Sequence, residues 1–311
     1  MSYEADDDEI EASRAPLLDH LIELRKRLII MIAALFVGFV VCFAFAAQLY
    51  EFLLHPFEIA GGILAVRQGG AAQGAPPPSG ALGPLIASWD GVKNMFLVLA
   101  GMKQAPATTA GQVTQLVATA PLEIFFTKVK LAALAGLALT FPVLAHQVYA
   151  FVAPGLYKRE RRAFLPFLVA SPVLFVVGAA MVYYIILPFV LWFSMSQQIL
   201  GTGGITVKLL PKVSEYFDLV TTLLLAFGLC FQLPVILTLL GMTGLVSSKM
   251  LFSGWRYAVA VVAVVAAIIT PPDPISMMLL IFPIVGLYFV SIGCVKLIEI
   301  GRKREDEAAA A

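Results

Sequence analysis

Long apolar runs separated by short polar segments dominate this chain of 311 residues. The runs occupy about residues 28–50, 124–152, 163–195, 216–245, 257–270 and 275–295. A bilayer core about 30 Å thick requires about 20 helical residues, so most of these runs are long enough to cross it. The pattern predicts an all-α polytopic membrane protein whose six transmembrane helices form a single domain of residues 17–298.

Two details predict an irregular bundle. The fifth run is bounded by Arg256 and Pro271, and at 1.5 Å per residue its helix reaches only about 21 Å, which predicts a tilted helix or a locally thinned bilayer. Prolines interrupt the longer runs and remove backbone donors, so we expect kinked helices in a bundle that is concave. These prolines are Pro142, Pro166, Pro172, Pro188, Pro234 and Pro283.

The segments outside the runs differ in character. Residues 1–16 are acidic and residues 299–311 are charged, so both are expected to be solvated tails. The connection after the first run contains a Gly- and Pro-rich stretch, about residues 69–84, which cannot bury enough apolar surface to fold. Residues 86–99 have the spacing of an amphipathic helix, and Pro56 is expected to end the first helical unit.

The positive charges predict an orientation. If the N-terminus is cytoplasmic, 14 of the 21 Lys and Arg residues lie on the inner side, in segments near residues 14, 25–27, 158–162, 249–256 and 296–304. The two short outer connections hold only Lys208 and Lys212. Because cytoplasmic loops carry the excess of Lys and Arg, both termini are expected to face the cytoplasm.

Composition supports a membrane class and excludes several functions. Hydrophobic residues make up 60% of the chain and charged residues 13%, where soluble domains have nearly a quarter. No basic and aromatic surface predicts nucleic-acid binding. Cys42, Cys230 and Cys294 lie far apart in apolar runs, which favours buried thiols over a metal site or a disulfide. No Walker, GxSxG or HExxH motif is present, so neither an enzyme nor a cofactor is predicted.

Two carboxylates lie among cations on the predicted inner side. Glu23 belongs to LLDHLIELRKRLII, residues 17–30, and Glu160 belongs to YKRERR, residues 157–162. Glu23 precedes Arg27 by four residues, so a weak intrahelical pair of about 0.3–0.5 kcal/mol is one interpretation. The other is that the two acids together bind a cationic ligand.

Gln232 is a polar residue near the middle of the fourth predicted span. It precedes Pro234 by two residues, and its amide could bond a carbonyl that the proline frees or one on a neighbouring helix. A role in binding a partner is the alternative. Because ionisable groups deep in the spans are scarce, a proton relay or ion pathway is not predicted.

Four segments together resemble the TatC family, the core subunit of the twin-arginine protein translocase. They are HLIELRKRL (20–28), FVAPGLYKRERR (151–162), FGLCFQLPV (227–235) and TPPDPIS (270–276). The resemblance implies a cupped-hand bundle of six helices in the bacterial inner membrane. It also implies a multimeric receptor that binds signal peptides of folded cargo and works with TatB and TatA, driven by the proton-motive force.

The resemblance also implies roles for particular residues. Glu23 and Glu160 match the acidic positions for the twin-arginine pair, and Arg25 and Phe151 match positions that shape the same surface. Guanidinium groups bind carboxylates through paired charged hydrogen bonds that lysine cannot form, which would explain selection of RR over KK. Gln232 matches a polar mid-membrane site where many members carry Glu. Pro56 and Asp273 match outer-face motifs and are expected to be structural.

Two other functions compete with the receptor. A secondary transporter or channel for a small solute would predict inverted repeats and a charged mid-membrane site, and the sequence offers neither clearly. A purely structural membrane scaffold would leave Glu23 and Glu160 dispensable.

Overall fold

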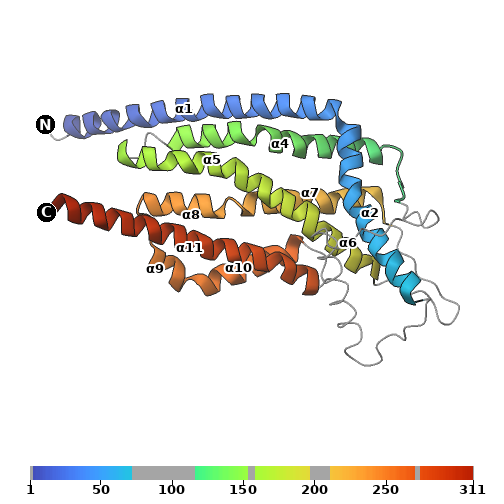
Figure 1. Ribbon diagram of the computed structural model, residues 1–311. Coiled ribbons are helices and arrows are strands. Elements are labelled where there is room, and N and C mark those ends of the chain that lie inside the picture. The colour runs from blue at the N-terminus through green and yellow to red at the C-terminus, as the bar shows by residue number, and fades with distance from the viewer. Residues whose placement is uncertain (1–2, 72–115, 153–157, 197–210, 270–273, 311) are drawn as a thin grey trace.

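The computed structural model describes residues 3–71, 116–152, 158–196, 211–269 and 274–310, with side chains for 21–61, 116–151, 168–195, 211–269 and 277–301. In these ranges the regular structure is helical, apart from one isolated parallel bridge between Val117 and Lys212. Most of the helices run along the bundle, and both termini lie at one end of it (Figure 1). We call this the N/C end and the opposite end, where α2 lies, the α2 end. The predicted all-α class is confirmed.

The described helices correspond to the six predicted runs. Five segments are long and apolar enough to cross a membrane: Leu21–Ala44, Glu123–Phe151, Leu168–Met195, Val213–Met242 and Met277–Gly301. The fifth predicted run forms a shorter apolar helix, α10 (Trp255–Ile269). Its 15 residues reach only about 22 Å.

Helices α1 (Tyr3–Ala44) and α4 (Glu123–Val152) lie against each other in opposite directions (Figure 1). Glycines allow the two backbones to approach. A Cβ atom added to Gly136 would lie 2.7 Å from the backbone nitrogen of Phe39, and one added to Gly38 would lie 2.9 Å from the carbonyl oxygen of Gly136. Small residues at such a crossing replace side-chain packing with backbone contact. Gly38 and Gly136 are therefore at the same level of the bundle.

The first helical unit ends earlier than the sequence predicts. The chain turns at Phe45, after which α2 (Ala46–Ala71) crosses the end of the bundle (Figure 1). The predicted span of 28–50 therefore ends at Ala44, and Pro56 lies inside α2 instead of ending a helix. No proline or glycine marks the turn. Burial of Leu53, Phe57 and Ala60 against the bundle holds α2 in this direction.

Pro56 leaves one backbone carbonyl of α2 without its usual donor, because proline has no N–H for the carbonyl four residues earlier. That carbonyl belongs to Phe52, and it accepts a hydrogen bond of 2.8 Å from the hydroxyl of Tyr183. The next carbonyl, of Leu53, accepts one of 2.5 Å from the hydroxyl of Tyr216. Tyr183 thus replaces the donor that Pro56 lacks, and Tyr216 adds a hydrogen bond from another helix to the next carbonyl.

The third and fourth runs are each interrupted. The third consists of α5 (Lys158–Met181), a π-helix (Val182–Ile186) and α6 (Leu187–Ser196). The fourth consists of α7 (Val213–Cys230) and α8 (Leu233–Met242), with a break at Phe231 and Gln232. The two runs cross closely, because a Cβ atom added to Gly228 would lie 2.5 Å from the ring of Phe175.

The last part of the chain packs α9 (Ser248–Ser253) on α11 (Pro274–Ala310). Glu299 of α11 accepts hydrogen bonds from the backbone N–H and the hydroxyl of Ser248, the former at 2.8 Å. The hydroxyl of Tyr288 donates to the carbonyl of Leu251 at 2.8 Å. Helix α11 continues into the predicted tail of 299–311 as far as Ala310, and α1 begins at Tyr3 inside the predicted tail of 1–16.

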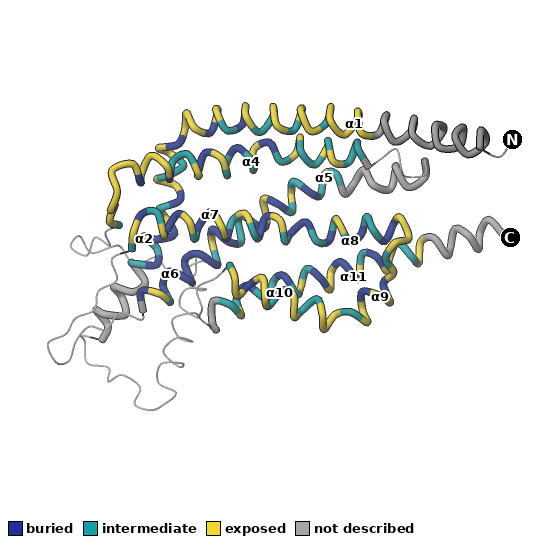
Figure 2. The backbone as a smooth tube through the Cα atoms, turned by 180° about the vertical axis from the view of Figure 1, so that it is seen from behind, coloured by how far each residue is buried: buried dark blue, intermediate teal, exposed yellow. Residues whose placement is uncertain are grey.

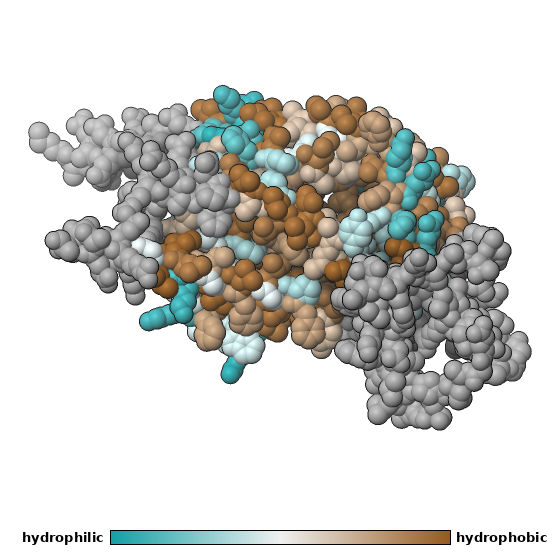
Figure 3. Space-filling model, in the orientation of Figure 1, coloured by the Kyte–Doolittle hydropathy of each residue, from teal (hydrophilic) through white to brown (hydrophobic). Residues whose placement is uncertain are grey.

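The larger buried cluster lies toward the α2 end and includes residues of α2, the π-helix, α6 and α7 (Figure 2). Its largest fully buried side chains include Trp192, Phe217 and Phe227. A smaller one joins Leu251 of α9 to Tyr288, Ile292 and Val295 of α11. In contrast, only 6% of the apolar window of α1 is buried, and its large side chains face outward. Apolar side chains cover much of the described surface (Figure 3). Such a surface is stable in lipid hydrocarbon and would be unstable in water.

The predicted outer connection lies mostly outside the described residues. Residues 69–71, the start of the predicted Gly- and Pro-rich insertion, form the end of α2. The rest of that insertion and the predicted amphipathic helix of 86–99 lie outside the described ranges.

Candidate functional site

The packing of α1 on α4 brings two predicted site residues to the same level. In antiparallel helices, equal steps away from a point of contact reach the same height, since each residue rises 1.5 Å. Glu23 is fifteen residues before Gly38, and Phe151 is fifteen residues after Gly136. Arg27 and Gln147, each eleven residues from their glycine, are in contact, which supports this register. Glu23 and Phe151 therefore lie together at the N/C end.

The carboxylate of Glu23 is half-buried and already has one cationic partner. Arg27 donates to its Oε1 atom from Nε at 3.1 Å and also contacts it through Nη2. The remaining arm of Arg27 reaches α4, where Nη1 lies 3.5 Å from Oε1 of Gln147. The intrahelical pair considered from the sequence is therefore present, and it also links α1 to α4. Both contacts with Glu23 use Oε1, so they leave Oε2 for a further donor.

The other predicted residues of this surface have different positions. Arg25 is exposed on α1, and Phe151 is half-buried near the end of α4. Glu160 lies in the first turn of α5, but its side chain is outside the described residues. The start of α5 lies at the N/C end, beside the end of α4 (Figure 1). The backbone thus brings residues 20–28 of the first predicted motif and the described residues of the second, 151–152 and 158–162, to one end of the bundle.

Gln232 lies in a different place, at the break between α7 and α8. It is buried, with 7% of its surface exposed, and faces Ser171 of α5. Its Oε1 accepts a hydrogen bond from the Ser171 hydroxyl at 2.7 Å, and its Nε2 donates to the Ser171 carbonyl at 3.0 Å. The amide thus bonds a neighbouring helix, one of the alternatives open from the sequence. A partner that uses Gln232 must compete with Ser171.

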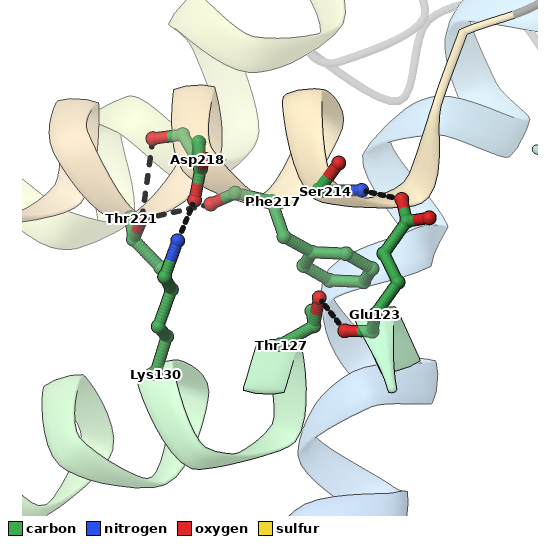
Figure 4. A network of polar contacts seen from close by, with 7 residues as sticks. All are labelled: Glu123, Thr127, Lys130, Ser214, Phe217, Asp218 and Thr221. Atoms are coloured by element: carbon green, nitrogen blue, oxygen red, sulfur yellow. Dashed lines mark hydrogen bonds and ion pairs between the residues drawn. The ribbon is translucent and has the colours of Figure 1, made fainter. Parts of the chain in front are cut away.

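At the α2 end, Glu123 is a polar residue that sequence reasoning missed. Its Oε2 accepts from the backbone N–H groups of Thr119 at 2.6 Å and Ala120 at 3.1 Å, and its Oε1 accepts from that of Ser214 at 2.8 Å. One carboxylate thus joins the starts of α4 and α7 (Figure 4). The available signal was an acid in the first turn of a helix, which satisfies free N–H groups.

An ion pair lies beside Glu123. Lys130 of α4 and Asp218 of α7 are 2.7 Å apart, and both side chains are about half exposed (Figure 4). An exposed pair of this kind contributes about 1 kcal/mol or less. Asp273, predicted as a structural residue of the outer face, lies outside the described residues. Within the described ranges, no group of three His, Cys, Asp or Glu residues could hold a metal ion.

Fold and site together define a multi-pass helical membrane protein with a charged surface at the N/C end. Comparison with known proteins identifies the class further. The family model described as "Sec-independent protein translocase protein (TatC)" matches residues 19–283. The chain belongs to the TatC family, whose members are protein translocase components and not enzymes. The resemblance stated from the four motifs is confirmed.

Relatives of the same name cover nearly the whole chain. A Sec-independent protein translocase protein TatC from Magnetococcus marinus is 38% identical over 298 residues, which cover 96% of this chain and 89% of the relative. One from Synechocystis is 32% identical and covers 94% of this chain and 91% of the relative. A chloroplastic TatC protein from Arabidopsis thaliana is 33% identical and covers 90% of this chain and 66% of the relative.

Two solved structures share the fold. The crystal structure of a twin arginine translocase receptor, TatC, in DDM superposes with a TM-score of 0.64 at 28% identity, covering 88% of this chain and 97% of that chain. A second crystal structure of a TatC receptor gives 0.61 at 29% identity, covering 89% and 98%. The chain is therefore a multi-pass membrane component of a protein translocase complex.

Proposed function

We propose that this chain is the receptor of a twin-arginine translocase, which binds the RR signal peptides of folded proteins at its N/C end. The observation that carries the proposal is the α1–α4 register, which supports a common surface for Glu23 and Phe151 beside the start of α5. Glu23 and Glu160 accept the paired guanidinium groups. Arg25 and Phe151 shape the surface around them.

The chemistry of Glu23 suits an arginine ligand. Arg27 occupies Oε1, and a second guanidinium can donate to Oε2, so that one carboxylate lies between two arginines. The link from Arg27 to Gln147 holds the carboxylate in place before the ligand arrives. Arginine carries a fork of donors for such a contact, whereas lysine offers only a point charge.

The remaining parts of the proposal concern topology and partners. Both termini face the cytoplasm of a bacterium whose inner membrane the chain spans, because the cations gather at the N/C end. The chain forms a multimeric complex with itself and with the single-span subunits TatB and TatA, and the proton-motive force drives export. A bundle this small cannot enclose a folded cargo, so recruited subunits must form the conduit. The short α10 assists by thinning the bilayer.

The receptor proposal predicts a loss of RR binding when either carboxylate is neutralised. Glu23→Gln and Glu160→Gln should each weaken binding of an RR peptide to the purified protein about tenfold or more, since a charged hydrogen bond contributes about 1.5–3 kcal/mol. Fluorescence anisotropy of a labelled peptide measures the affinity, and a KK peptide measures specificity.

The matched control for this experiment is Glu215→Gln, which neutralises an exposed acid at the α2 end. This variant should bind the RR peptide as the wild type does. The proposal is contradicted if both test variants bind the RR peptide with unchanged affinity and the wild type binds the KK peptide as tightly as the RR peptide. These carboxylates would then neither bind the ligand nor select it.

We also propose that Gln232 contributes to association with the single-span subunits. Gln232→Leu should reduce their co-purification and export, while the protein's own stability falls by about 1 kcal/mol or less, the usual value of a hydrogen bond between membrane helices. Thr238→Val is the control, because Thr238 is buried in α8, six residues after Gln232, and its hydroxyl donates to the Pro234 carbonyl of the same helix. Undiminished co-purification and export would confine Gln232 to its bond with Ser171.

A further inference from the structure

An apolar groove lies under α2 in the half of the bundle nearest the α2 end. Its volume is about 310 Å³, and side chains of α2, α4, α5, the π-helix and α7 line it. Phe52 and Leu53 of α2 form one wall. Four small side chains leave the space between the helices open: Ala135 and Ala138 on α4, and Ala179 and Ala180 on α5. The groove is open to the surface beside Tyr184. It is separate from the surface around Glu23.

The register of α1 and α4 gives the depth of the groove. Lys128 is eight residues before Gly136, so it is level with Ala46, eight residues after Gly38, where the first span has ended and α2 begins. We place the boundary between hydrocarbon and headgroups near this level, because the first candidate span ends at Ala44 and the ion pair of Lys130 and Asp218 lies close to it. Leu131 to Ala138 lie three to ten residues further along α4, about 5–15 Å deeper. The groove therefore lies at the depth of acyl chains in the leaflet at the α2 end.

Lys128 lies on the face of α4 that lines the groove, at the end of that face nearest the α2 end. Lys128 precedes Leu131 by three residues and Ala135 by seven, so it lies on the stripe of α4 that lines the groove. Helical side chains lean toward the N-terminus of their helix, which for α4 is the α2 end, so the ammonium extends toward the headgroups. Lys130, two residues on, faces elsewhere and pairs with Asp218. No described carboxylate lies within ion-pair distance of Lys128.

Water is a poor occupant of this groove. A bound water needs two to four polar partners, whereas the lining is aliphatic and aromatic apart from the hydroxyls of Tyr183 and Tyr184. The hydroxyl of Tyr183 already donates to the carbonyl of Phe52. A groove that opens sideways at acyl-chain depth is filled by hydrocarbon, the solvent of the spans.

We propose that the groove binds one acyl chain of an anionic phospholipid from the leaflet at the α2 end, with Lys128 paired to its phosphate. The apolar lining selects the chain, and the cation selects the headgroup. The bound acyl chain packs against α2 on its side toward the N/C end and fixes the angle at which this helix crosses the bundle. This inference does not depend on the proposed recognition of signal peptides.

Photolabelling in a bilayer tests the proposal. The full-length protein is placed in phosphatidylcholine nanodiscs with a trace of phosphatidylglycerol that carries a diazirine in its acyl chain, and labelled peptides are mapped by mass spectrometry. We expect adducts to concentrate on residues 131–138 and 175–180. Labelling there should fall about fivefold in Lys128→Gln, as expected for one cation near a membrane surface, and should also fall in Ala135→Leu, which narrows the groove.

Each variant has a matched control on the same helix. Lys130→Gln removes an equal charge from another face, and Ala133→Leu adds equal bulk at an exposed position. Both should label as the wild type does, and a thermal melt of every variant verifies folding.

Four results would overturn the proposal. Labelling spread evenly over the groove and the exposed face of α1 would indicate ordinary surrounding lipid. Equal groove labelling in the wild type and in Lys128→Gln would indicate the same. Displacement of the label by an added RR peptide would assign the groove to the peptide. Crosslinks between grooves of two chains would assign it to a second copy.

Discussion

Gly136→Ala should destabilise this protein by about 2 kcal/mol, although alanine is the better helix former. A Cβ atom at this position would lie within 3 Å of backbone atoms of Gly38 and Phe39. Backbone atoms of a packed helix cannot move aside as a flexible side chain can. The substitution must therefore push α1 and α4 apart along their whole contact.

Unfolding in mixed micelles of rising denaturing detergent measures this effect. Gly286→Ala in α11 is the matched control, since no heavy atom lies within 4 Å of a Cβ atom added there. It should leave stability unchanged or raise it slightly. Because separation of α1 and α4 also shifts Glu23 relative to Phe151, Gly136→Ala should weaken RR-peptide binding while Gly286→Ala does not. Equal stability of the two alanine variants would contradict the close approach of the helices.

Removing both tyrosine hydroxyls that serve α2 should cost about 2–4 kcal/mol. Tyr183→Phe leaves the Phe52 carbonyl without a donor, and such an unsatisfied group costs about 1–3 kcal/mol. Tyr216→Phe removes a second hydrogen bond, to the Leu53 carbonyl, which is worth about 0.5–1.5 kcal/mol. Both side chains are buried, and their donors reach the carbonyls of Phe52 and Leu53. The same unfolding assay measures the single and double variants.

A double-mutant cycle with Pro56→Ala isolates the cause. Alanine at position 56 restores an N–H group that can bond the carbonyl of Phe52, so Tyr183→Phe should cost about 1 kcal/mol less in that background. Tyr184→Phe, an exposed neighbour in the π-helix, is the control and should change little. Strict additivity of Pro56→Ala and Tyr183→Phe would show that the tyrosine does not replace the proline's missing donor.

Much of the architecture follows from local sequence. Apolar runs of the required length predict helices in lipid wherever they occur, because a backbone in hydrocarbon must bond to itself. The second run illustrates this, since α4 (Glu123–Val152) begins within one residue of its predicted start. Four short motifs, two of them around Glu23 and Glu160, were together sufficient to suggest the family by resemblance.

Other features could not be read from local sequence. The turn at Phe45 has no proline or glycine to mark it. Pro56 is of a residue type that usually ends a helix, yet it lies inside α2. The buried contacts of Leu53, Phe57 and Ala60 outweigh the cost of the proline, and Tyr183 and Tyr216 reduce that cost. Glu123 was missed for a related reason, because its partner Ser214 is 91 residues away in the chain.

The sequence by itself determined the membrane class, the number of apolar helices, the expected orientation and the family, because hydrophobicity, charge counts and motifs are properties of neighbouring residues. Only the tertiary structure decided that Glu23 lies level with Phe151, that Gln232 is bonded to Ser171, and that α2 crosses the bundle over an apolar groove. These depend on how closely helices approach and in what register. Glycines and hydrogen bonds between distant segments set both.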